Sequence, residues 1–564
     1  MNGGLLASEN LDISLVARWL DHCVNNHQET CSILRPDRGD REIRTMIKGG
    51  FRLGDDLRVI DVHAMKICSA PQGLSYCALS YLWGGISMLK TLKENFGRLS
   101  QDSGIVEEEL PLTIRDAIHF CRKIGWQYLW VDALCIIQDD EVNVASQISQ
   151  MQSIYRFADF TIVAASGVDS NAGLPGIQTA RKVSQHMEKI QGLRLVTTLP
   201  PFEHIQETSR WSTRAWTFQE SKLSRRLIIF SDGQMHFRCE GGEFCEDTRI
   251  ETQSRTGEPG RAYSPFLSTS LLLGAPHGRG FDIFQDLVAQ YSQKVLSYPE
   301  DILNGFSGII NALKPFGTIG QYWISGLPVE GSRLVDSLLW IPTYQHASEL
   351  RRFNIFQTDF VQRPGKYVAI DSRNKRVEDG AYHKFPSWSW IGWMGDIDYL
   401  ETPPATITHD CVASADYYIL TINARILNFN VRNTNRGIPS TSFDVYNIED
   451  SNGDIISDFI YRFDLVERDE VKRFEVLLLV TVEGDRADTP VRPRQWKPLS
   501  RYVGTAEAMN DPKREVHHGP YLNAMVISKP ANYPKEPAER VALVNVPMKY
   551  WDAEGVMRQE VLIG

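Results

Sequence analysis

The sequence lacks any apolar run of the roughly 20 residues that a membrane-spanning helix needs. Its longest aliphatic stretch, VLLLVTV at residues 476–482, has the length of a strand. Near the start, Glu9 and Asp12 interrupt the continuous apolar segment that a secretory signal requires. We therefore expect no membrane span and a cytoplasmic or nuclear location, of which we select the cytoplasm.

The sequence also lacks an excess of basic residues. It contains 60 Lys and Arg and 70 Asp and Glu, which gives a formal net charge of -10. This balance argues against a nucleic-acid surface formed by bulk charge. The nine cysteines are an odd number without a paired framework, so reduced thiols are expected. Neither a Walker motif nor a GxGxxG between a strand and a helix is present, so nucleotide binding of those kinds is not predicted.

What the sequence does contain is typical of a folded chain with several domains, since 42% of its 564 residues are hydrophobic and 23% are charged. Shifts in periodicity and composition suggest five regions. We predict an N-terminal helix and lead-in over residues 1–57, an α/β domain over 58–250 with its core at 76–220, a linker or loop over 251–280, a helical region over 281–395 and a β-rich region over 396–564.

Strand and helix patterns alternate within the predicted α/β domain. RVIDVHAMKI at 58–67 has the pattern of a strand that precedes this alternation. Short connections between alternating strands and helices are typical of a mostly parallel sheet with helices on its faces. The predicted order is a strand at 76–83, a helix at 110–126, a strand at 128–137, a helix at 144–158 and a strand at 160–166.

Polar side chains follow these strands, at the edge of a parallel sheet where ligands bind. YLWVDALCIIQDD at 128–140 places Asp132 inside a predicted buried strand, where a carboxylate needs donors and often has a perturbed pKa. A structural aspartate that ties down a loop is the alternative. We select Asp132, Asp139 and Glu220 as candidate catalytic carboxylates; the candidate ligand-binding residues are Ser80, Trp83, Gln138, Arg214, Trp216 and Gln219.

The candidates from Arg214 to Glu220 lie within a short segment, STRAWTFQE. An arginine and a carboxylate beside an aromatic side chain could form a ligand clamp. The same spacing equally describes the salt-bridged start of an ordinary helix, and spacing alone favours that simpler interpretation.

CVNNHQETC places Cys23, His27 and Cys31 at intervals of four, which puts three metal-binding side chains on one helical face. A structural zinc site needs four ligands, and no CxxC or HxxxH motif supplies the fourth. Cys68 is conceivable as that ligand. We predict no metal site and no cofactor.

Five sequence blocks in order resemble the fungal heterokaryon incompatibility (HET) domain: YCALSYLWG, LPLTIRDAI, YLWVDALCIIQDD, MQSIYRFA and STRAWTFQE. Further blocks, including ILNGFSGIINAL and PSWSWIGW, resemble the region that commonly follows this domain. The resemblance implies non-self recognition that triggers growth arrest or programmed cell death, with an incompatibility partner or self-association as the protein contact. It also implies a distant similarity to TIR domains, which have a flavodoxin-like sheet and in some members cleave NAD.

TIR enzymes carry their catalytic glutamate in a pattern of Trp, two residues and Glu, and HET domains often have a similar pattern before the residue that corresponds to Met151. This sequence has Val144 and Gln147 at those positions. An amide supplies no negative charge, so another acid, such as Glu141, Asp140 or one of the candidates above, would have to replace it. A non-catalytic interaction or regulatory protein, associated with a biosynthetic gene cluster, is the alternative function.

Overall fold

The computed structural model describes most of the first 314 residues and shorter ranges beyond them. The described residues are 5–27, 31, 54, 56–71, 74–181, 183–248, 280–298, 301–314, 319–330, 333–342, 351–352, 359–363, 366–370, 387–399, 407–409, 411–416, 419–433, 444–453, 455–461, 471–482, 521–528, 538–547 and 558–563. The predicted linker at 251–280 lies outside this set except for its last residue.

The chain divides into two compact units. The first comprises Met1–Ala275, Lys294–Leu296 and Asn304–Phe316, and the second comprises Pro276–Gln293, Ser297–Leu303 and Gly317–Gly564. No helix among the described residues is both long enough and apolar enough to span a membrane.

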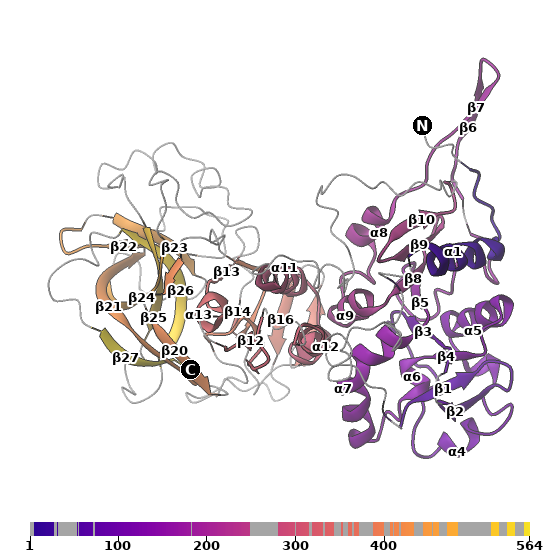
Figure 1. Cartoon of the computed structure of the whole chain (residues 1–564), viewed down its shortest axis with the longest axis horizontal. Coiled ribbons are helices and arrows are strands. Elements are labelled where there is room, and N and C mark those ends of the chain that lie inside the picture. Colours follow the sequence, from indigo (N-terminus) through magenta and orange to yellow (C-terminus); the bar gives the residue numbers. More distant parts are fainter. Residues whose placement is uncertain are drawn as a thin grey trace. The chain divides into compact units, whose positions relative to one another are not determined.

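An eight-stranded sheet forms the centre of the first unit (Figure 1). The middle strands β4, β3, β5 and β8 are parallel, and antiparallel strands flank them on both sides. The order across the sheet is β10 (Gly242–Cys245), β9 (Met235–Cys239), β8 (Arg226–Phe230), β5 (Thr161–Ala164), β3 (Cys77–Ser80), β4 (Tyr128–Trp130), β1 (Arg58–Asp61) and β2 (Lys66–Ser69).

The chain reverses direction across this sheet at β3. It leaves β3 for β4 on one side and then crosses to β5 on the other, which is the strand order of doubly wound, flavodoxin-like sheets. Ligands of such sheets bind beyond the carboxyl ends of the strands at this reversal. The predicted fold class is thus confirmed, and the strand order points to the end of β3 at Ser80.

Helices cover both faces of the sheet in Figure 1. On the face of α1 and α5, Cys77 of β3 contacts Cys121 of α5 with 3.1 Å between the sulfur atoms. On the face of α7 and α9, Ser80 bonds Glu220 of α9. The helices of this unit are α1 (Ile13–Asn26), α4 (Phe96–Leu99), α5 (Leu112–Ile124), α6 (Asp132–Cys135), α7 (Glu141–Phe157), α8 (Phe202–Thr208), α9 (Ala215–Leu223) and α12 (Asn304–Leu313), with a 3-10 turn at Glu107–Glu109.

The local sequence explains where the longer helices begin and end. Asp140 accepts a hydrogen bond from the Asn143 amide and so caps the start of α7. Gly125 ends α5 with a φ of 82°, in the left-handed region that glycine adopts at little cost. Successive side chains of a strand point to opposite faces of the sheet. Ile228 and Ile229 accordingly lie in separate apolar clusters, so both faces of the sheet are buried.

The predicted strands differ from the observed ones in length: those predicted at 76–83 and 160–166 are the shorter β3 and β5. Residues 58–67 form the hairpin of β1 and β2 rather than one strand, with its turn at 62–65. The strand predicted at 128–137 ends at Trp130, and Asp132 begins the single helical turn α6. Hydrophobic periodicity could not show where the strand at 128–137 ends, because a short buried helical turn and a buried strand are equally apolar.

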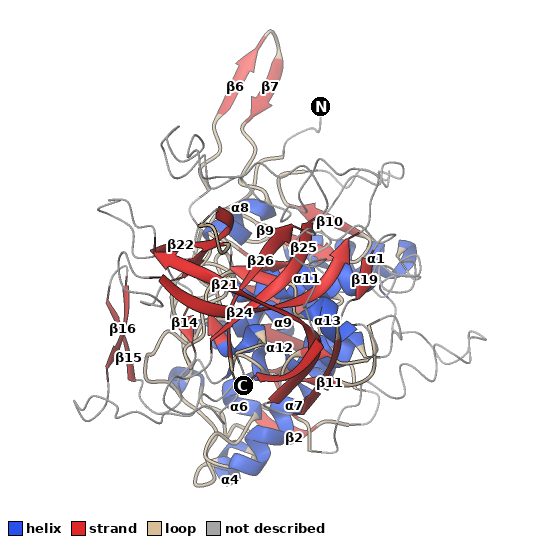
Figure 2. Cartoon of the chain, turned by 90° about the vertical axis from the view of Figure 1, so that its left-hand side faces the viewer, coloured by secondary structure: helices blue, strands red, loops and turns tan. Residues whose placement is uncertain are grey.

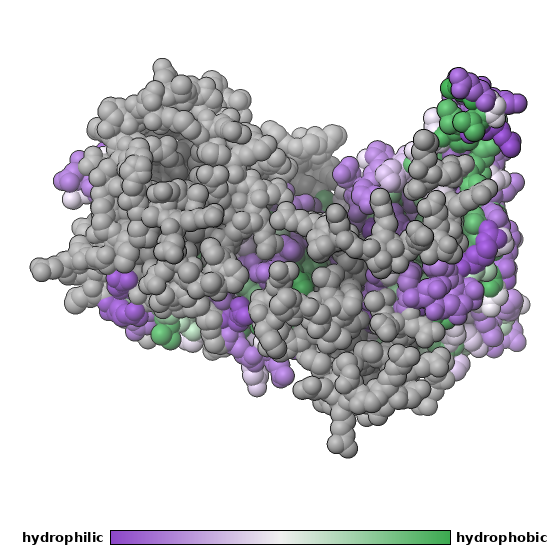
Figure 3. Space-filling view, turned by 45° about the horizontal axis from the view of Figure 1, so that its top comes forward, coloured by the Kyte–Doolittle hydropathy of each residue, from purple (hydrophilic) through white to green (hydrophobic). Residues whose placement is uncertain are grey.

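A second hairpin, of β6 (Met187–Ile190) and β7 (Leu193–Val196), projects from the unit at the upper right of Figure 1. Figure 3 shows apolar side chains on its surface. The register of the hairpin places Ile190, Leu193 and Leu195 on one face, and each has about half or more of its surface exposed.

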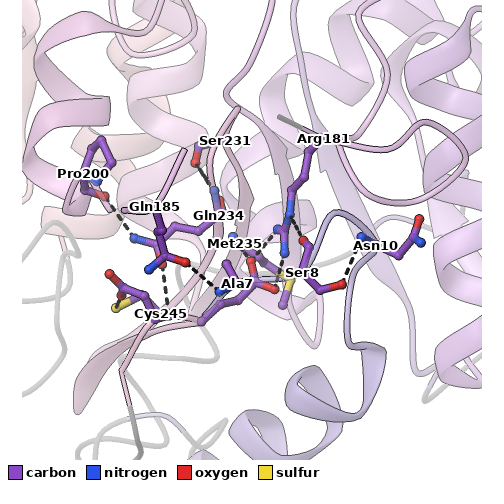
Figure 4. Close-up of polar contacts among 12 residues, drawn as sticks. Ala7, Ser8, Asn10, Arg181, Gln185, Pro200, Ser231, Gln234, Met235 and Cys245 are labelled. Carbon is purple, nitrogen blue, oxygen red and sulfur yellow. Dashed lines mark hydrogen bonds and ion pairs between the residues drawn. The ribbon is translucent and has the colours of Figure 1, made fainter. Parts of the chain in front are cut away.

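The segment before α1 is held against the hairpin of β9 and β10 by a buried arginine (Figure 4). Arg181 donates through Nε to the Ser8 carbonyl at 2.8 Å and pairs through both terminal nitrogens with the Glu246 carboxylate. The Glu246 carboxylate also accepts the Met235 amide. Arg181 therefore connects the amino-terminal segment to the edge of the sheet.

The second unit contains a nine-stranded antiparallel sheet, whose strands are drawn in red in Figure 2 and which includes the predicted strand at 476–482. Its strands are β19 (Ile407–His409), β20 (Val412–Asp416), β21 (Ile419–Asn433), β22 (Asp444–Glu449), β23 (Ile455–Tyr461), β24 (Val471–Val482), β25 (Tyr521–Ser528), β26 (Glu539–Pro547) and β27 (Arg558–Ile563).

Before that sheet, the described residues of the second unit form two helices and four two-stranded ladders. The helices are α11 (Gly280–Ser292) and α13 (Arg333–Ser337), with a 3-10 turn at Trp390–Gly392. The ladders pair β11 (Trp323–Ile324) with β12 (Leu327–Pro328), β13 (Trp340–Pro342) with β18 (Ile397–Tyr399), β14 (Arg351–Arg352) with β17 (Trp393–Met394), and β15 (Asp359–Arg363) with β16 (Lys366–Ile370).

Replacing Arg181 with methionine should destabilise the first unit by about 3–5 kcal/mol, because the buried Glu246 carboxylate would lose its cation. Urea denaturation of the purified chain measures this change. Arg18→Met is the matched control: Arg18 pairs with Asp12 at 3.6 Å with both side chains more than half exposed, so its loss should cost at most about 1 kcal/mol. Equal effects of the two substitutions would contradict the structural role of Arg181.

Gly84→Ala and Gly85→Ala should differ in stability although both glycines have φ near +72°. A Cβ at Gly84 would lie 2.0 Å from the Cβ of Asp169, whereas nothing lies within 4 Å of a Cβ at Gly85. We expect Gly84→Ala to cost about 1–3 kcal/mol more, which urea denaturation of both variants would measure. A smaller loss for Gly84→Ala than for Gly85→Ala would be inconsistent with this close contact.

Candidate functional site

A buried hydrogen-bond chain lies at the carboxyl end of β3. The Ser80 hydroxyl donates to Oε2 of Glu220 at 2.5 Å and accepts from the indole nitrogen of Trp211 at 2.7 Å. All three side chains are buried, with Glu220 7% exposed. The sequence segments at 76–83 and 211–220 are thus joined by side-chain contacts at the reversal of the sheet.

The helix α9 brings Glu220 to this position. The helix begins after Arg214, whose carbonyl accepts the Thr217 hydroxyl at 3.0 Å, and Thr217 also bonds the Trp211 carbonyl at 2.6 Å. These bonds fix the turn that carries Trp211 against the first turn of α9. Glu220, one and a half turns further on, therefore faces β3.

Asp132 lies at the end of the neighbouring strand, β4. Its carboxylate accepts the indole N–H of Trp83 at 2.9 Å and the Ala133 amide at 2.7 Å. Asp132 and Trp83 are both half-buried. The Lys90 ammonium lies over the Trp83 ring, 4.5 Å from its centroid. The loop after β3 and the turn after β4 thus meet through the Trp83–Asp132 bond.

The two carboxyl groups influence each other electrostatically. Burial raises the pKa of Glu220 to about 7, and the charge of Asp132 adds to this shift, while the bond from Ser80 and the charge of Arg214 oppose it. Burial also raises the pKa of Asp132, against the opposing effect of its bonds from Ala133 and Trp83 and the charge of Arg214. The positive charge of Arg214 therefore lowers the pKa of both acids.

Two tyrosines complete the interior of this cluster. Tyr155 of α7 donates its hydroxyl to the Leu79 carbonyl at 3.2 Å, and Tyr81 follows Ser80 directly. Burial raises the pKa of both hydroxyls, and the charges of Glu220 and Asp132 raise them further. Both phenols therefore stay neutral and can only act as hydrogen-bonding groups.

Burial divides the cluster into two layers. Ser80, Trp211 and Glu220 are buried, whereas Asp132 and Arg214 keep part of their surface exposed. A ligand that approaches from solvent would therefore meet an anionic and a cationic side chain first. The carboxyl group of Glu220 is buried and bonded to Ser80.

The structure places the other candidate residues around this cluster or away from it. Gln138 donates to the Asp132 carbonyl at 2.9 Å and so supports the α6 turn. Asp139 is exposed and accepts the Lys93 amide at 2.9 Å, which ties a surface loop. Trp216 is half-buried and packs against the core, and Gln219 faces Gly308 of α12 in the interior.

Gln147, at the position where the resemblance leads one to expect an acid, has a structural partner. Its side-chain nitrogen donates to the Asp56 carboxylate at 3.0 Å, and its side chain is fully buried. Asp56 also accepts Ser146 and Gln150, so three residues of α7 hold this one aspartate. Gln147 therefore serves to attach the segment before β1.

Sequence reasoning did not identify Trp211, Tyr81 or Tyr155 as members of the cluster. Trp211 directly precedes the STRAWTFQE block, and Tyr155 lies within MQSIYRFA. Their positions within or beside these blocks were the available signal. Their roles, however, depend on contacts with Ser80 and Leu79, which lie far away in the sequence.

The elements that build this site coincide with the region of the chain that matches a known family. Residues 76–220, which run from the start of β3 to Glu220, match the family model described as heterokaryon incompatibility protein (HET). Comparisons with curated proteins and with solved structures gave no match. We therefore assign residues 76–220 to the heterokaryon incompatibility family as the HET domain of this chain.

Proposed function

We propose that this chain is a cytoplasmic incompatibility effector whose HET domain binds NAD and cleaves its nicotinamide glycosidic bond, and so triggers growth arrest or cell death. The observation that carries the proposal is the presence of two acids, Glu220 and Asp132, at the carboxyl ends of the neighbouring parallel strands β3 and β4. The charge of Arg214 acts on both acids. The resemblance to TIR domains, some of which cleave NAD, suggests NAD as the substrate. The matched HET family supports a role in incompatibility.

The reaction requires little acid catalysis, because nicotinamide leaves NAD as a neutral molecule. The electron pair of the C–N bond goes to the pyridine nitrogen, water adds its oxygen to the ribose carbon, and one proton is released. The transition state carries positive charge on the ribose, which a fixed carboxylate stabilises. Asp132, oriented by Trp83 and Ala133, is the group proposed for this role, and Arg214 is proposed to bind the pyrophosphate.

Glu220 is proposed as a positioning residue. Its carboxyl group accepts from Ser80, which in turn accepts from Trp211, so it cannot turn toward solvent without breaking this chain. Because Asp132 raises the pKa of Glu220, ionisation of the two acids is coupled. A neutral Glu220 leaves the negative charge of the pair on Asp132, nearer to the proposed ligand.

One observation favours a second function, that of a non-catalytic interaction protein. Gln147 occupies the position at which TIR enzymes carry their catalytic glutamate, and its side chain donates a hydrogen bond to Asp56. In this alternative the HET domain assembles with an incompatibility partner or with itself, and the acid cluster serves only to stabilise the fold. Such a protein would act without consuming NAD.

Asp132→Asn should lower NAD hydrolysis by at least about 100-fold, because the charge facing the ribose would be lost while the size of the side chain stays the same. Loss of NAD and release of nicotinamide by the purified chain measure this effect, and inducible expression in a fungal host should show growth arrest only with the active protein. Asp102→Asn is the matched control, since Asp102 is exposed and pairs only at the surface with Lys66. Unchanged NAD at high protein concentration would refute cleavage, and arrest without NAD loss would favour the interaction protein.

Glu220→Gln should remove a pH dependence of stability between pH 4.5 and 7. Because the pKa of Glu220 is raised from its usual 4.5 to about 7, the folded chain holds a proton in this range that the unfolded chain has released. Stability therefore falls as the pH rises from 4.5 to 7 and then levels off, by roughly 3 kcal/mol from this group. Urea denaturation across this range should give a flatter curve for Glu220→Gln than for the wild type; parallel curves would contradict the assignment.

A further inference from the structure

Four metal-binding side chains lie together on the face of the sheet opposite to the acid cluster, between α1 and the end of β9. Their ligand atoms, one nitrogen and three sulfurs, are all within 4.8 Å of one another. We call them the cysteine–histidine cluster; its members are Cys23, His27, Cys31 and Cys239.

We propose that the cysteine–histidine cluster binds one zinc ion, which fastens the amino-terminal helix to the central sheet. The side-chain set of three cysteines and one histidine is one that structural zinc sites use. Ligand atoms around a tetrahedral zinc lie roughly 3.5–3.8 Å apart, given bonds of about 2.0–2.3 Å. The observed spacing is within about 1 Å of this arrangement.

The backbone brings the ligands together from two distant segments. Cys23 lies in the last turns of α1, and the Cys31 amide bonds the His27 carbonyl at 2.8 Å, which continues the helical spacing. Cys239 is the last residue of β9, and its sulfur lies 3.2 Å from Nδ1 of His27. Cys68, the fourth ligand that the sequence suggested, lies instead on β2 at the other edge of the sheet.

The surroundings of the cluster match the charge of a zinc site. Zinc with three thiolates and a neutral imidazole carries one net negative charge, which burial would penalise without a neighbouring cation. The buried Arg226 supplies this cation, since its Nε donates to the Cys23 sulfur at 3.1 Å and it is the cross-strand neighbour of Cys239. Within the described part of the chain, Arg226 pairs with no carboxylate, so its charge is available to the sulfurs.

The turn between β9 and β10 holds the histidine ring in place. A Cβ at Gly241 would lie 2.3 Å from Cγ of His27, and one at Gly242 would lie 3.5 Å from Cε1. Glycine at position 241 therefore permits the ring to lie against the backbone with Nδ1 toward Cys239. Such support of a ligand's orientation is typical of metal sites.

Metal analysis of the purified full-length chain tests the proposal. After dialysis, we expect about one zinc per chain, and Cys239→Ser and His27→Ala should each lower this content strongly. Cys68→Ser is the matched control, because it removes a half-buried thiol of the same sheet outside the cluster. Circular dichroism of each variant separates loss of metal from loss of fold.

Cobalt substitution provides a second measurement that does not depend on the variants folding. The reduced, metal-free wild type should bind one cobalt ion with the intense visible absorption of tetrahedral thiolate coordination, and zinc should displace it. Gly241→Ala should weaken binding by about 10–100-fold, because it displaces the His27 ring. Absence of stoichiometric zinc and cobalt binding by the reduced wild type, or a disulfide among Cys23, Cys31 and Cys239 in the protein as isolated from a reducing cell, would overturn the proposal.

Discussion

The parallel pairing of β3 with both β4 and β5 is the constraint on which the rest of the HET domain depends. It makes β3 the strand at which the chain reverses direction, and it places Ser80 at the open end of that strand. The bond from Ser80 to Glu220 then draws α9 onto the same end of the sheet. The two acids come to the same end of the sheet because strand order, and not sequence proximity, determines which side chains lie there.

Much of this domain could be predicted from the sequence. The order of the main strands and helices from β3 to β5 followed from periodicity, and α5 ends at Ile124, within two residues of the end predicted for this helix. The strand predicted at 128–137 is longer than the observed β4, which ends at Trp130. The apolar segment VDALC fits a buried strand and a buried helical turn equally well, and it forms the turn α6. Asp132 consequently starts α6 at the end of β4 instead of lying within the strand.

The candidate site was predictable in its location but not in its contacts. The rule that ligands bind beyond the carboxyl ends of parallel strands selected Ser80, Trp83 and Asp132, and the structure joins the last two by a hydrogen bond. The partnership of Ser80 with Trp211 could not be read from spacing, since 130 residues separate them. Cys239 was missed as a neighbour of His27 for the same reason: hairpin register and helix docking together bring them within 3.2 Å.

The close contact of Gly84 with Asp169 has a consequence for motion at this end of the sheet. The loop after β3 lies against the backbone of the loop after β5, with no room for a side chain between them. Ser170 adds a hydrogen bond to the Trp83 carbonyl at 3.4 Å. The two loops are therefore packed against each other, and separating them would break both the close contact at Gly84 and the bond from Ser170.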